Sequence, residues 1–374
     1  MLSYIEISKE NLLNNFEAMK SLVKPGVKIA AVIKANAYGH GQNEVVQILE
    51  DDADYFQVDD ARELELLRQV SQKPTLVLGF VSKEEMPSVI GNEGIFSVYD
   101  EGQIFSLNEI SAGLNKKVSV HLKIDACLGR QGVLIENVQK IIDVLADCSN
   151  IVVDGIYSHF ANIEDTSDFS HAQKQIDSFT QAVKIFEKNG YSDLQTHISA
   201  SSGIMVYENA QGKSSIVRAG LGIYGMWPSE ELKERFESES FKLKPVMRWV
   251  THVAQIKTLP ENYSIGYGLT YITSKQTKIA VIPQGYSDGY DRGLSNIGEV
   301  LINGSRCKVL GRIAMNMFVV DVSHLDKIAL EDEVVLLGKQ EDEEITAEEI
   351  AAHIGSINYE ITTRVFAMLP RVIK

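Results

Sequence analysis

The amino-acid sequence predicts an α/β fold, a (β/α)8 TIM barrel, followed by a C-terminal all-β domain. Two observations predict this organisation. Strand-like runs alternate with helical patterns in the first part of the chain, and short β-rich runs with many glycines make up the second part. The charged stretch 229–243 between them is typical of an exposed connection. At 374 residues the chain is long for one ordinary domain and comfortable for two.

The first part of the chain contains eight strand-like runs. After an apolar/polar alternation at 4–7, Ser8 is placed to cap a helix that has apolar residues on one face. The eight runs that follow span 28–34, 55–58, 75–80, 95–99, 118–125, 152–159, 194–200 and 215–224. The clearest helical patterns between them span 44–50, 61–70, 135–146 and 170–188. Eight strands alternating with helices over roughly 200 residues favour a barrel, whose usual length is ~250 residues.

A doubly wound open sheet would show the same alternation, but no glycine fingerprint follows the first run. Past Pro245 the alternation stops. Short β-rich runs separated by glycines then lie at 250–257, 278–282, 300–302, 308–310, 318–322 and 334–337. We therefore expect a barrel domain over residues 8–240 and a β domain over residues 241–374, to which the N-terminal strand 1–7 could also belong.

Composition excludes several classes of protein. The net charge of −15 disfavours nucleic acid and anionic membranes as partners. The three cysteines have no CxxC spacing, which indicates a reducing compartment and gives no metal site. The N-terminus has no secretory pattern, and no run of ~18 apolar residues occurs. We expect a cytoplasmic protein.

In a (β/α)8 barrel, functional groups gather at the carboxyl ends of the strands. Lys34 ends the first run, where a lysine is costly to desolvate unless it is paired, covalently used or extended to solvent. The ends of other runs carry polar side chains as well, namely Lys123, Asp125, Arg130, His159, Ser199, Ser201, Ser202 and Arg218. Such a set at separate strand ends favours a site for an anionic cofactor.

Eight segments in order resemble the alanine racemase family. The first is Lys34-Ala-Asn-Ala-Tyr38-Gly-His-Gly, and together the segments cover about residues 28 to 371. The resemblance implies pyridoxal 5'-phosphate as cofactor, held by Lys34 as a Schiff base. It also implies that the hydroxyls of Tyr38 and Ser201, with the N–H groups of Gly220 and Leu221, bind the phosphate. Hydroxyls and free N–H groups at turns and helix starts do bind anions.

The resemblance places Arg218 against the pyridine nitrogen of the cofactor and His159 beside its ring. A guanidinium does not give up its proton at neutral pH, so the ring nitrogen stays unprotonated and the electron sink is weakened. This disfavours transamination. By itself, an arginine at a strand end is more often an ion-pair partner, and a histidine there can be a satisfied core residue.

The segment from Lys123 to Gly132 resembles the family pattern Lys-x-Asp-Thr-Gly-Met-x-Arg-x-Gly, but Ala-Cys-Leu replaces Thr-Gly-Met. The resemblance implies that Arg130 binds the substrate carboxylate. It also implies a carbamylated Lys123 that holds Arg130, and two neighbouring cations in a covered site would favour that modification. A second departure is His197-Ile-Ser-Ala-Ser201, where the family has His-x-x-Asn-Ser.

The β domain carries three more matching segments, around Tyr267, Met315 and Tyr359, and a loop at 285–290 that resembles the entrance to the site. Here the resemblance implies a catalytic Tyr267, a Met315 backbone N–H near the substrate, and a Tyr359 that closes the pocket and reaches the phosphate. It implies a homodimer in which Tyr267 and Met315 complete the site of the other subunit. Lys34 would serve D-alanine and Tyr267 would serve L-alanine.

We therefore expect an isomerase that interconverts L-alanine and D-alanine by two-base proton transfer and supplies D-alanine for peptidoglycan. A serine or broad-specificity amino-acid racemase is an alternative. A decarboxylase of similar fold would set a carboxylate against the pyridine nitrogen, which Arg218 disfavours. A non-catalytic pyridoxal-phosphate carrier built of the barrel alone would lack the β domain.

Overall fold

The structure is a computed structural model that describes residues 1–209, 212, 214–239 and 241–374. It divides into two compact units. The barrel unit comprises residues 12–37 and 45–244, and the β unit comprises residues 1–11, 38–44 and 245–374. The domain boundary expected at residue 240 lies outside the described residues. None of the described helices is both long enough and apolar enough to cross a membrane.

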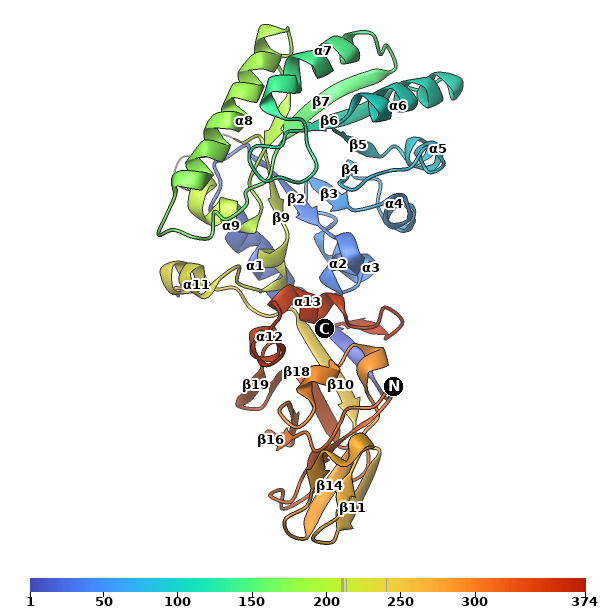
Figure 1. Cartoon of the computed structure of the whole chain (residues 1–374), viewed down its shortest axis with the longest axis vertical. Helices are drawn as coiled ribbons and strands as arrows, with labels where there is room; N and C mark the ends of the chain where they lie inside the picture. The colour runs from blue at the N-terminus through green and yellow to red at the C-terminus, as the bar shows by residue number, and fades with distance from the viewer. Residues whose placement is uncertain (210–211, 213, 240) are drawn as a thin grey trace. The chain divides into compact units, whose positions relative to one another are not determined.

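The barrel unit is built on one sheet of eight parallel strands, which confirms the predicted fold class (Figure 1). The strands are β2 (Lys28–Val32), β3 (Tyr55–Val58), β4 (Thr75–Val77), β5 (Ile95–Val98), β6 (Val118–Lys123), β7 (Ile151–Tyr157), β8 (Gln195–His197) and β9 (Ile216–Ala219). Their order is β8-β7-β6-β5-β4-β3-β2-β9. Two backbone hydrogen bonds, Ser215 N–H to Thr196 O and Arg218 N–H to Ser199 O, join the ends of this order. The barrel is therefore nearly closed.

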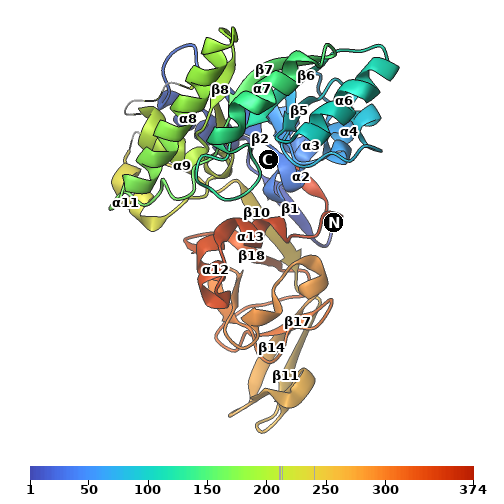
Figure 2. The ribbon, with the colours of Figure 1, turned by 45° about the horizontal axis from the view of Figure 1, so that its top comes forward.

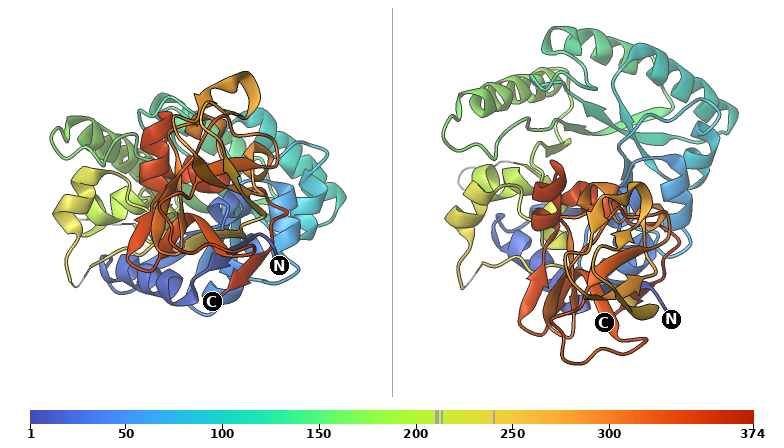
Figure 3. Two further views of the ribbon diagram at one scale, coloured as in Figure 1. Left: turned by 90° about the horizontal axis from the view of Figure 1, so that it is seen from below. Right: turned by 60° about the horizontal axis from the view of Figure 1, so that its bottom comes forward.

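Helices cover the outside of the barrel strands (Figures 1 and 2), and Figure 3 shows them from two further directions. They include α1 (Lys9–Ser21), α3 (Gln42–Leu49), α4 (Ala61–Leu67), α5 (Met86–Gly91), α6 (Glu101–Gly113), α7 (Val138–Ala146), α8 (Ser170–Lys188) and α9 (Ser201–Gly203). The hydroxyl of Ser8 accepts from the N–H of Asn11 at 3.2 Å and caps α1 as expected. Leu12, Phe16 and Met19 on that helix are fully buried.

Two parts of the barrel unit differ from the sequence prediction. Helix α6 was not among the predicted patterns, because its buried positions include the polar residues Gln103, Ser106 and Ser111 and weaken the apolar periodicity. The stretch expected to be only an exposed connection contains helix α11 (Glu230–Phe236). Ser229 caps it, and acidic residues in its first turn and basic residues in its last turn favour the helix dipole.

The β unit contains three sheets. The largest has the order β16-β15-β18-β10-β1-β20, with β19 paired to β18. Its strands are β1 (Tyr4–Ile7), β10 (Met247–His252), β15 (Glu299–Ile302), β16 (Ser305–Lys308), β18 (Glu333–Gln340), β19 (Glu343–Ile345) and β20 (Arg371–Ile373). The smaller sheets join β11 (Gln255–Leu259), β14 (Thr277–Ile282) and β17 (Phe318–Asp321), and β12 (Ser264–Ile265) with β13 (Tyr271–Ile272). The N-terminal strand β1 thus pairs with strands from the far end of the chain.

The predicted run at 250–257 is two strands, β10 and β11, and the run predicted at 308–310 begins at the last residue of β16. Two short helices, α12 (Ala347–Ile354) and α13 (Asn358–Thr363), accompany the sheets. Glycines and short apolar runs predict strands but not their ends, because hairpin register depends on partner strands. The all-β character predicted for this part of the chain is confirmed.

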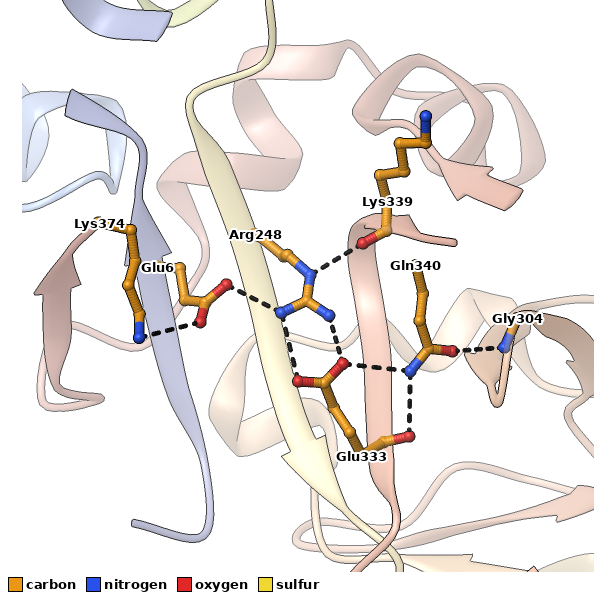
Figure 4. Close-up of polar contacts among 7 residues, drawn as sticks. All are labelled: Glu6, Arg248, Gly304, Glu333, Lys339, Gln340 and Lys374. Atoms are coloured by element: carbon orange, nitrogen blue, oxygen red, sulfur yellow. Dashed lines mark hydrogen bonds and ion pairs between the residues drawn. The ribbon is translucent and has the colours of Figure 1, made fainter. Parts of the chain in front are cut away.

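An ion-pair cluster on Arg248 ties the three central strands of the largest sheet together (Figure 4). Its guanidinium on β10 pairs with Glu6 on β1 at 2.8 Å and with Glu333 on β18. Its Nε–H also donates to the carbonyl of Lys339 at 2.9 Å. Gln340 donates to Glu333 from the same strand. Because Arg248 and Glu6 are mostly buried, removing one partner would leave the other charge without compensation.

Candidate active site

Lys34 begins a turn of left-handed backbone directly after strand β2. Ala35, Asn36, Ala37 and Tyr38 all have φ of 53° or 54°. Each such L-residue costs roughly 1–2 kcal/mol relative to right-handed backbone, and only asparagine tolerates the conformation well. The sequence predicted a strand through Lys34 and an ordinary turn beyond it. The segment α2 (Lys34–Tyr38) is instead a strained turn that the surrounding structure holds in place.

The carboxylate of Glu63 on helix α4 holds this turn. Its Oε1 accepts from the N–H of Ala35 at 2.6 Å, and its Oε2 accepts from the N–H of Asp59 at 2.7 Å. One side chain therefore ties the end of β2 to the end of β3. Burial raises the pKa of the Glu63 carboxyl, which shows that this clamp is partly removed from water. Asp60 caps α4 by accepting from the N–H of Glu63 at 2.8 Å.

Four basic side chains of the barrel unit lie close enough to affect each other's charge. They are Lys34, Lys123, Arg130 and Arg218. Burial, followed by the charges of Arg130, Arg218 and Lys34, lowers the pKa of the Lys123 amine to about 8. The nearest acidic partner is Asp59, whose Oδ1 lies 3.4 Å from the Nζ of Lys34. The cluster therefore carries an excess of positive charge, which is the chemistry that binds anions.

Lys123 lies at the end of β6 and is 5% exposed. Its ammonium donates to Oε1 of Gln131 at 2.9 Å. Asp125 holds the loop between these residues, because its Oδ1 accepts from the N–H groups of Leu128 and Gly129 at 2.8 and 3.0 Å. Cys127 stands in left-handed backbone with φ of 62°, where the family pattern has glycine.

Arg218 on β9 is 3% exposed, and both terminal nitrogens of its guanidinium donate hydrogen bonds. Nη1 donates to Nδ1 of His197 at 2.8 Å, and Nη2 donates to Nδ1 of His159 at 2.9 Å and to the carbonyls of Ser158 and Ile198 at 2.9 and 3.0 Å. All four partners named here are neutral acceptors. These four contacts orient the guanidinium without neutralising its charge.

His159 and Tyr157 surround the guanidinium. Burial and the neighbouring cations, Arg218 first, lower the pKa of His159 well below its usual value, so this imidazole is neutral at pH 7. The Tyr157 ring stacks on His197 with centroids 4.7 Å apart, and Cζ of Arg218 lies 5.5 Å above the Tyr157 ring. Burial raises the pKa of Tyr157 to about 12, so its phenol stays protonated and bonds the hydroxyl of Ser97 at 2.5 Å.

Ser201 begins α9 after β8, and it meets the turn that follows β9. Its hydroxyl oxygen accepts from the N–H of Gly220 at 3.2 Å and from the N–H of Gly222 at 3.1 Å. The hydroxyl proton of Ser201 remains to be donated. Sequence analysis expected the N–H groups of Gly220 and Leu221 to face a phosphate, whereas the structure engages Gly220 with Ser201.

The remaining predicted residues lie in the β unit. Tyr38 is half-buried, and Gly39 beside it packs on the carbonyl of Thr362 in α13, so closely that a Cβ at Gly39 would lie 1.9 Å from that oxygen. Helix α13 carries Tyr359, which is 41% exposed. The structure therefore brings together, within one unit, two of the segments that sequence analysis assigned to the phosphate.

Tyr267 and Met315 lie on loops of the β unit and are 74% and 55% exposed. Tyr267 opens the short helix η4 (Tyr267–Leu269), which glycines with φ of 72° flank and interrupt. The carbonyl of Met315 accepts from the N–H and the hydroxyl of Ser287 at 3.1 and 2.8 Å. This contact joins the Met315 segment to the predicted entrance loop.

Several residues of the barrel unit that contact the site residues or their hydrogen-bond partners were not among the predicted site residues. They are Asp59, Glu63, Gln131, Tyr157, His121, Asp154 and His197. Glu63 and Asp154 carry no sequence signal, because an acidic residue in a helix or a strand is ordinary. His197 and Tyr157 could have been found as polar residues inside runs that otherwise predict buried strands.

The chain is similar to known proteins along its whole length. It matches the alanine racemase N-terminal domain over residues 7–228 and the alanine racemase C-terminal domain over residues 246–373. A curated relative, alanine racemase from Methanococcus maripaludis, is 37% identical over 99% of this chain and 98% of its own length.

Two solved structures are similar over all of this chain. Alanine racemase from Clostridium difficile 630 has a TM-score of 0.93 and 33% identity, with 96% of that chain covered. Alanine racemase from Bacillus anthracis with bound L-Ala-P has a TM-score of 0.93 and 30% identity, with 95% of that chain covered. At these identities the likeness extends beyond the fold.

The Glu63 clamp predicts how the turn after Lys34 responds to mutation. Glu63→Gln replaces one acceptor oxygen with an amide that cannot accept, so one of the two backbone N–H groups loses its charged partner. Amide hydrogen exchange in the peptide 33–38 should become at least ~10-fold faster. The control is Glu65→Gln on the same helix, where the carboxylate bonds Ser88. Equal exchange in the two variants would contradict the clamp.

Proposed function

The chain belongs to the alanine racemase family, and we propose that it interconverts L-alanine and D-alanine with pyridoxal 5'-phosphate and supplies D-alanine for peptidoglycan. The observation that carries this proposal is the surrounding of Arg218. Its buried guanidinium is held by four neutral acceptors, two of them histidine nitrogens, and a guanidinium keeps its proton at neutral pH. Such a group leaves a pyridine nitrogen unprotonated, which suits racemisation better than transamination or decarboxylation.

The residues of the barrel unit fit pyridoxal phosphate. The cofactor is an anion with an aldehyde, and it needs an amine, phosphate donors and a partner for its ring nitrogen. Lys34 supplies the amine at the end of β2, the Ser201 hydroxyl has a proton to donate, and Arg218 supplies the partner. The excess positive charge described above favours an anion there. From the β unit, Tyr38 and Tyr359 would donate further hydroxyls to the phosphate.

When bound, pyridoxal phosphate acidifies the Cα–H bond of the amino acid by delocalising the charge left on Cα. Lys34 and Tyr267 would then move the proton at Cα, one on each face. Lys34 would act on D-alanine and Tyr267 on L-alanine. His159 is neutral and is hydrogen-bonded to Arg218. We assign it the role of connecting Arg218 to Tyr267.

Arg130 would bind the substrate carboxylate, with Lys123 beside it to keep it oriented. Because the pKa of Lys123 is lowered to about 8, a substantial fraction of this amine is neutral at physiological pH. A neutral amine can add carbon dioxide, and the resulting carbamate would be an anion next to Arg130. We infer that Lys123 is carbamylated in the working enzyme. Met315 and Tyr359 would leave room for a methyl group at Cα, so serine should be a weaker substrate.

The exposure of Tyr267 supports a homodimer with composite sites. Tyr267 is 74% exposed in one chain, which leaves its side chain accessible to a partner subunit. We propose that Tyr267 and Met315 of each subunit complete the site that contains Lys34 of the other subunit. We also place the protein in the cytoplasm, because its three cysteines are unpaired, as in a reducing compartment.

A chiral assay over a panel of amino acids tests the proposed function. The purified protein with pyridoxal phosphate should racemise alanine fastest, serine more slowly, and lysine or arginine hardly at all. Lys34→Ala should abolish turnover, and borohydride reduction of the unmodified enzyme should place the pyridoxyl group on Lys34. Release of carbon dioxide would support a decarboxylase, and a cofactor spectrum without turnover would support a carrier.

Subunit mixing tests the composite site. Lys34→Ala and Tyr267→Phe homodimers should each be inactive, because every site lacks one base. After subunit exchange, half of the dimers are mixed and have one complete site, so about one quarter of the wild-type activity should return. Exchange is followed with two differently tagged chains. If tagged mixed dimers form and no activity returns, the two residues act in the same subunit.

Carbamylation of Lys123 predicts a pH-dependent signal. The lowered pKa means that the folded protein loses this proton near pH 8, whereas the unfolded chain holds it to ~10.4. Between these values the unmodified protein therefore becomes more stable as pH rises. With 13C-labelled bicarbonate, a carbamate resonance should appear and grow from pH 7 to pH 8. Lys123→Arg should remove it, whereas Lys34→Ala should keep it. A resonance that persists in Lys123→Arg would assign the carbamate elsewhere.

A further inference from the structure

A continuous line of hydrogen bonds runs through the interior of the barrel from Arg218 to Asp154. Nη1 of Arg218 contacts Nδ1 of His197 at 2.8 Å, Nε2 of His197 contacts Nδ1 of His121 at 2.8 Å, and Nε2 of His121 contacts Oδ2 of Asp154 at 3.4 Å. The links come from β9, β8, β6 and β7, which lie in one sheet. The interior of a barrel of this kind is normally filled with layers of apolar side chains.

The chemistry of Arg218 and of Asp154, at the two ends of the line, determines which atom donates in each hydrogen bond. A guanidinium only donates, so Nδ1 of His197 must accept and its single proton must be on Nε2. That proton is donated to Nδ1 of His121, whose own proton is then on Nε2 and is donated to the Asp154 carboxylate. Both histidines must therefore be neutral in the same tautomer. Burial, then Arg218 and His121, lower the pKa of His197 well below its usual value, in agreement with a neutral ring.

Strand β7 contains a β-bulge at Asp154. Val120 pairs with Val153 and His121 pairs with Gly155, so Asp154 is an extra residue, a β-bulge, opposite β6. A bulge redirects a side chain, and here it brings the carboxylate to His121. The next residue has to be glycine, because a Cβ at Gly155 would lie 2.7 Å from the His121 ring. His121 itself is 1% exposed, whereas the Asp154 side chain is 40% exposed.

We propose that Asp154 and His121 are positioning residues that hold the guanidinium of Arg218 in place through His197. The carboxylate selects the tautomer of His121, which selects that of His197, so that a lone pair always faces Arg218. This matters because the other cations of the site, Lys34, Lys123 and Arg130, repel the guanidinium. The line also links Arg218 to the carboxylate of Asp154 through two imidazole rings. The proposal rests on the proposed function only for the identity of the ligand group that Arg218 meets, the pyridine nitrogen of the cofactor.

Neutron diffraction from deuterium-exchanged crystals tests the direction of the line without any activity. We expect deuterium on Nε2 of both His121 and His197 and none on their Nδ1 atoms. Deuterium on Nδ1 of either ring would overturn the proposal. This outcome does not depend on whether the protein is a racemase.

A matched pair of variants tests the effect on the site. Gln and Leu have similar volumes, but the Gln amide spaces an acceptor and a donor much as the imidazole does. His121→Leu should lower kcat about 10-fold or more with KM within about 2-fold, as when the hydrogen-bond partner behind an active-site ligand is removed. It should also shift the visible absorption band of the bound cofactor. His121→Gln should recover kcat to within about 3-fold of the original and restore the band.

Two results would overturn the proposal. Equal losses of kcat in the Leu and Gln variants would mean that His121 acts by packing on Gly155. No loss of kcat in either variant would mean that the hydrogen bonds of the line do not affect the site. As a control, Asp143→Asn on α7 removes one negative charge away from the line. It should change neither kcat nor the absorption band. If His121→Leu does not fold, Asp154→Leu and Asp154→Asn give the same comparison at a half-exposed position. If the protein proves not to be a racemase, the absorption band and the neutron result still test whether the line positions Arg218.

Discussion

A buried guanidinium is the constraint on which the rest of the barrel unit depends. Arg218 is almost fully removed from water, and an unpaired charge in such a place would be very costly. Neutral acceptors at the ends of β7 and β8 contribute to meeting this cost, namely Ser158, His159, His197 and Ile198. These groups solvate the guanidinium inside the barrel. A guanidinium also keeps its proton at neutral pH, so Arg218 offers a positive charge at its strand.

The cations next to Arg218 also carry a cost in free energy. Lys123 lies close to Arg130, Arg218 and Lys34, and its pKa is lowered first by burial and then by the repulsion of these cations. An apoprotein with such a cluster is less stable than it could be, and the binding of an anionic cofactor would relieve the repulsion. The strained turn after Lys34 adds a second local cost, which Glu63 offsets with two short hydrogen bonds. Both features concentrate unfavourable free energy where the cofactor would bind.

The β unit contributes groups of a different kind. Tyr267 and Met315 are exposed and lie on loops shaped by glycines with positive φ, whereas the barrel groups are buried on strand ends. Exposed groups on loops suit a site completed from outside the barrel, and buried groups suit the fixed part of a site. This division of roles agrees with a homodimer whose subunits share their active sites.

Much of this organisation follows from the sequence alone. Apolar runs at 28–34, 118–125 and 215–224 predict strands because buried parallel strands need continuous apolar stretches. The barrel rule then places Lys34, Lys123 and Arg218 at one end of the sheet. The left-handed turn, the bulge at Asp154 and the line through His121 and His197 were not predictable in this way. Each depends on which atom of one strand faces which atom of another, and that register is settled only when the strands pair. The sequence thus determines which chemical groups reach the site, whereas the direction of each hydrogen bond is decided by tertiary packing.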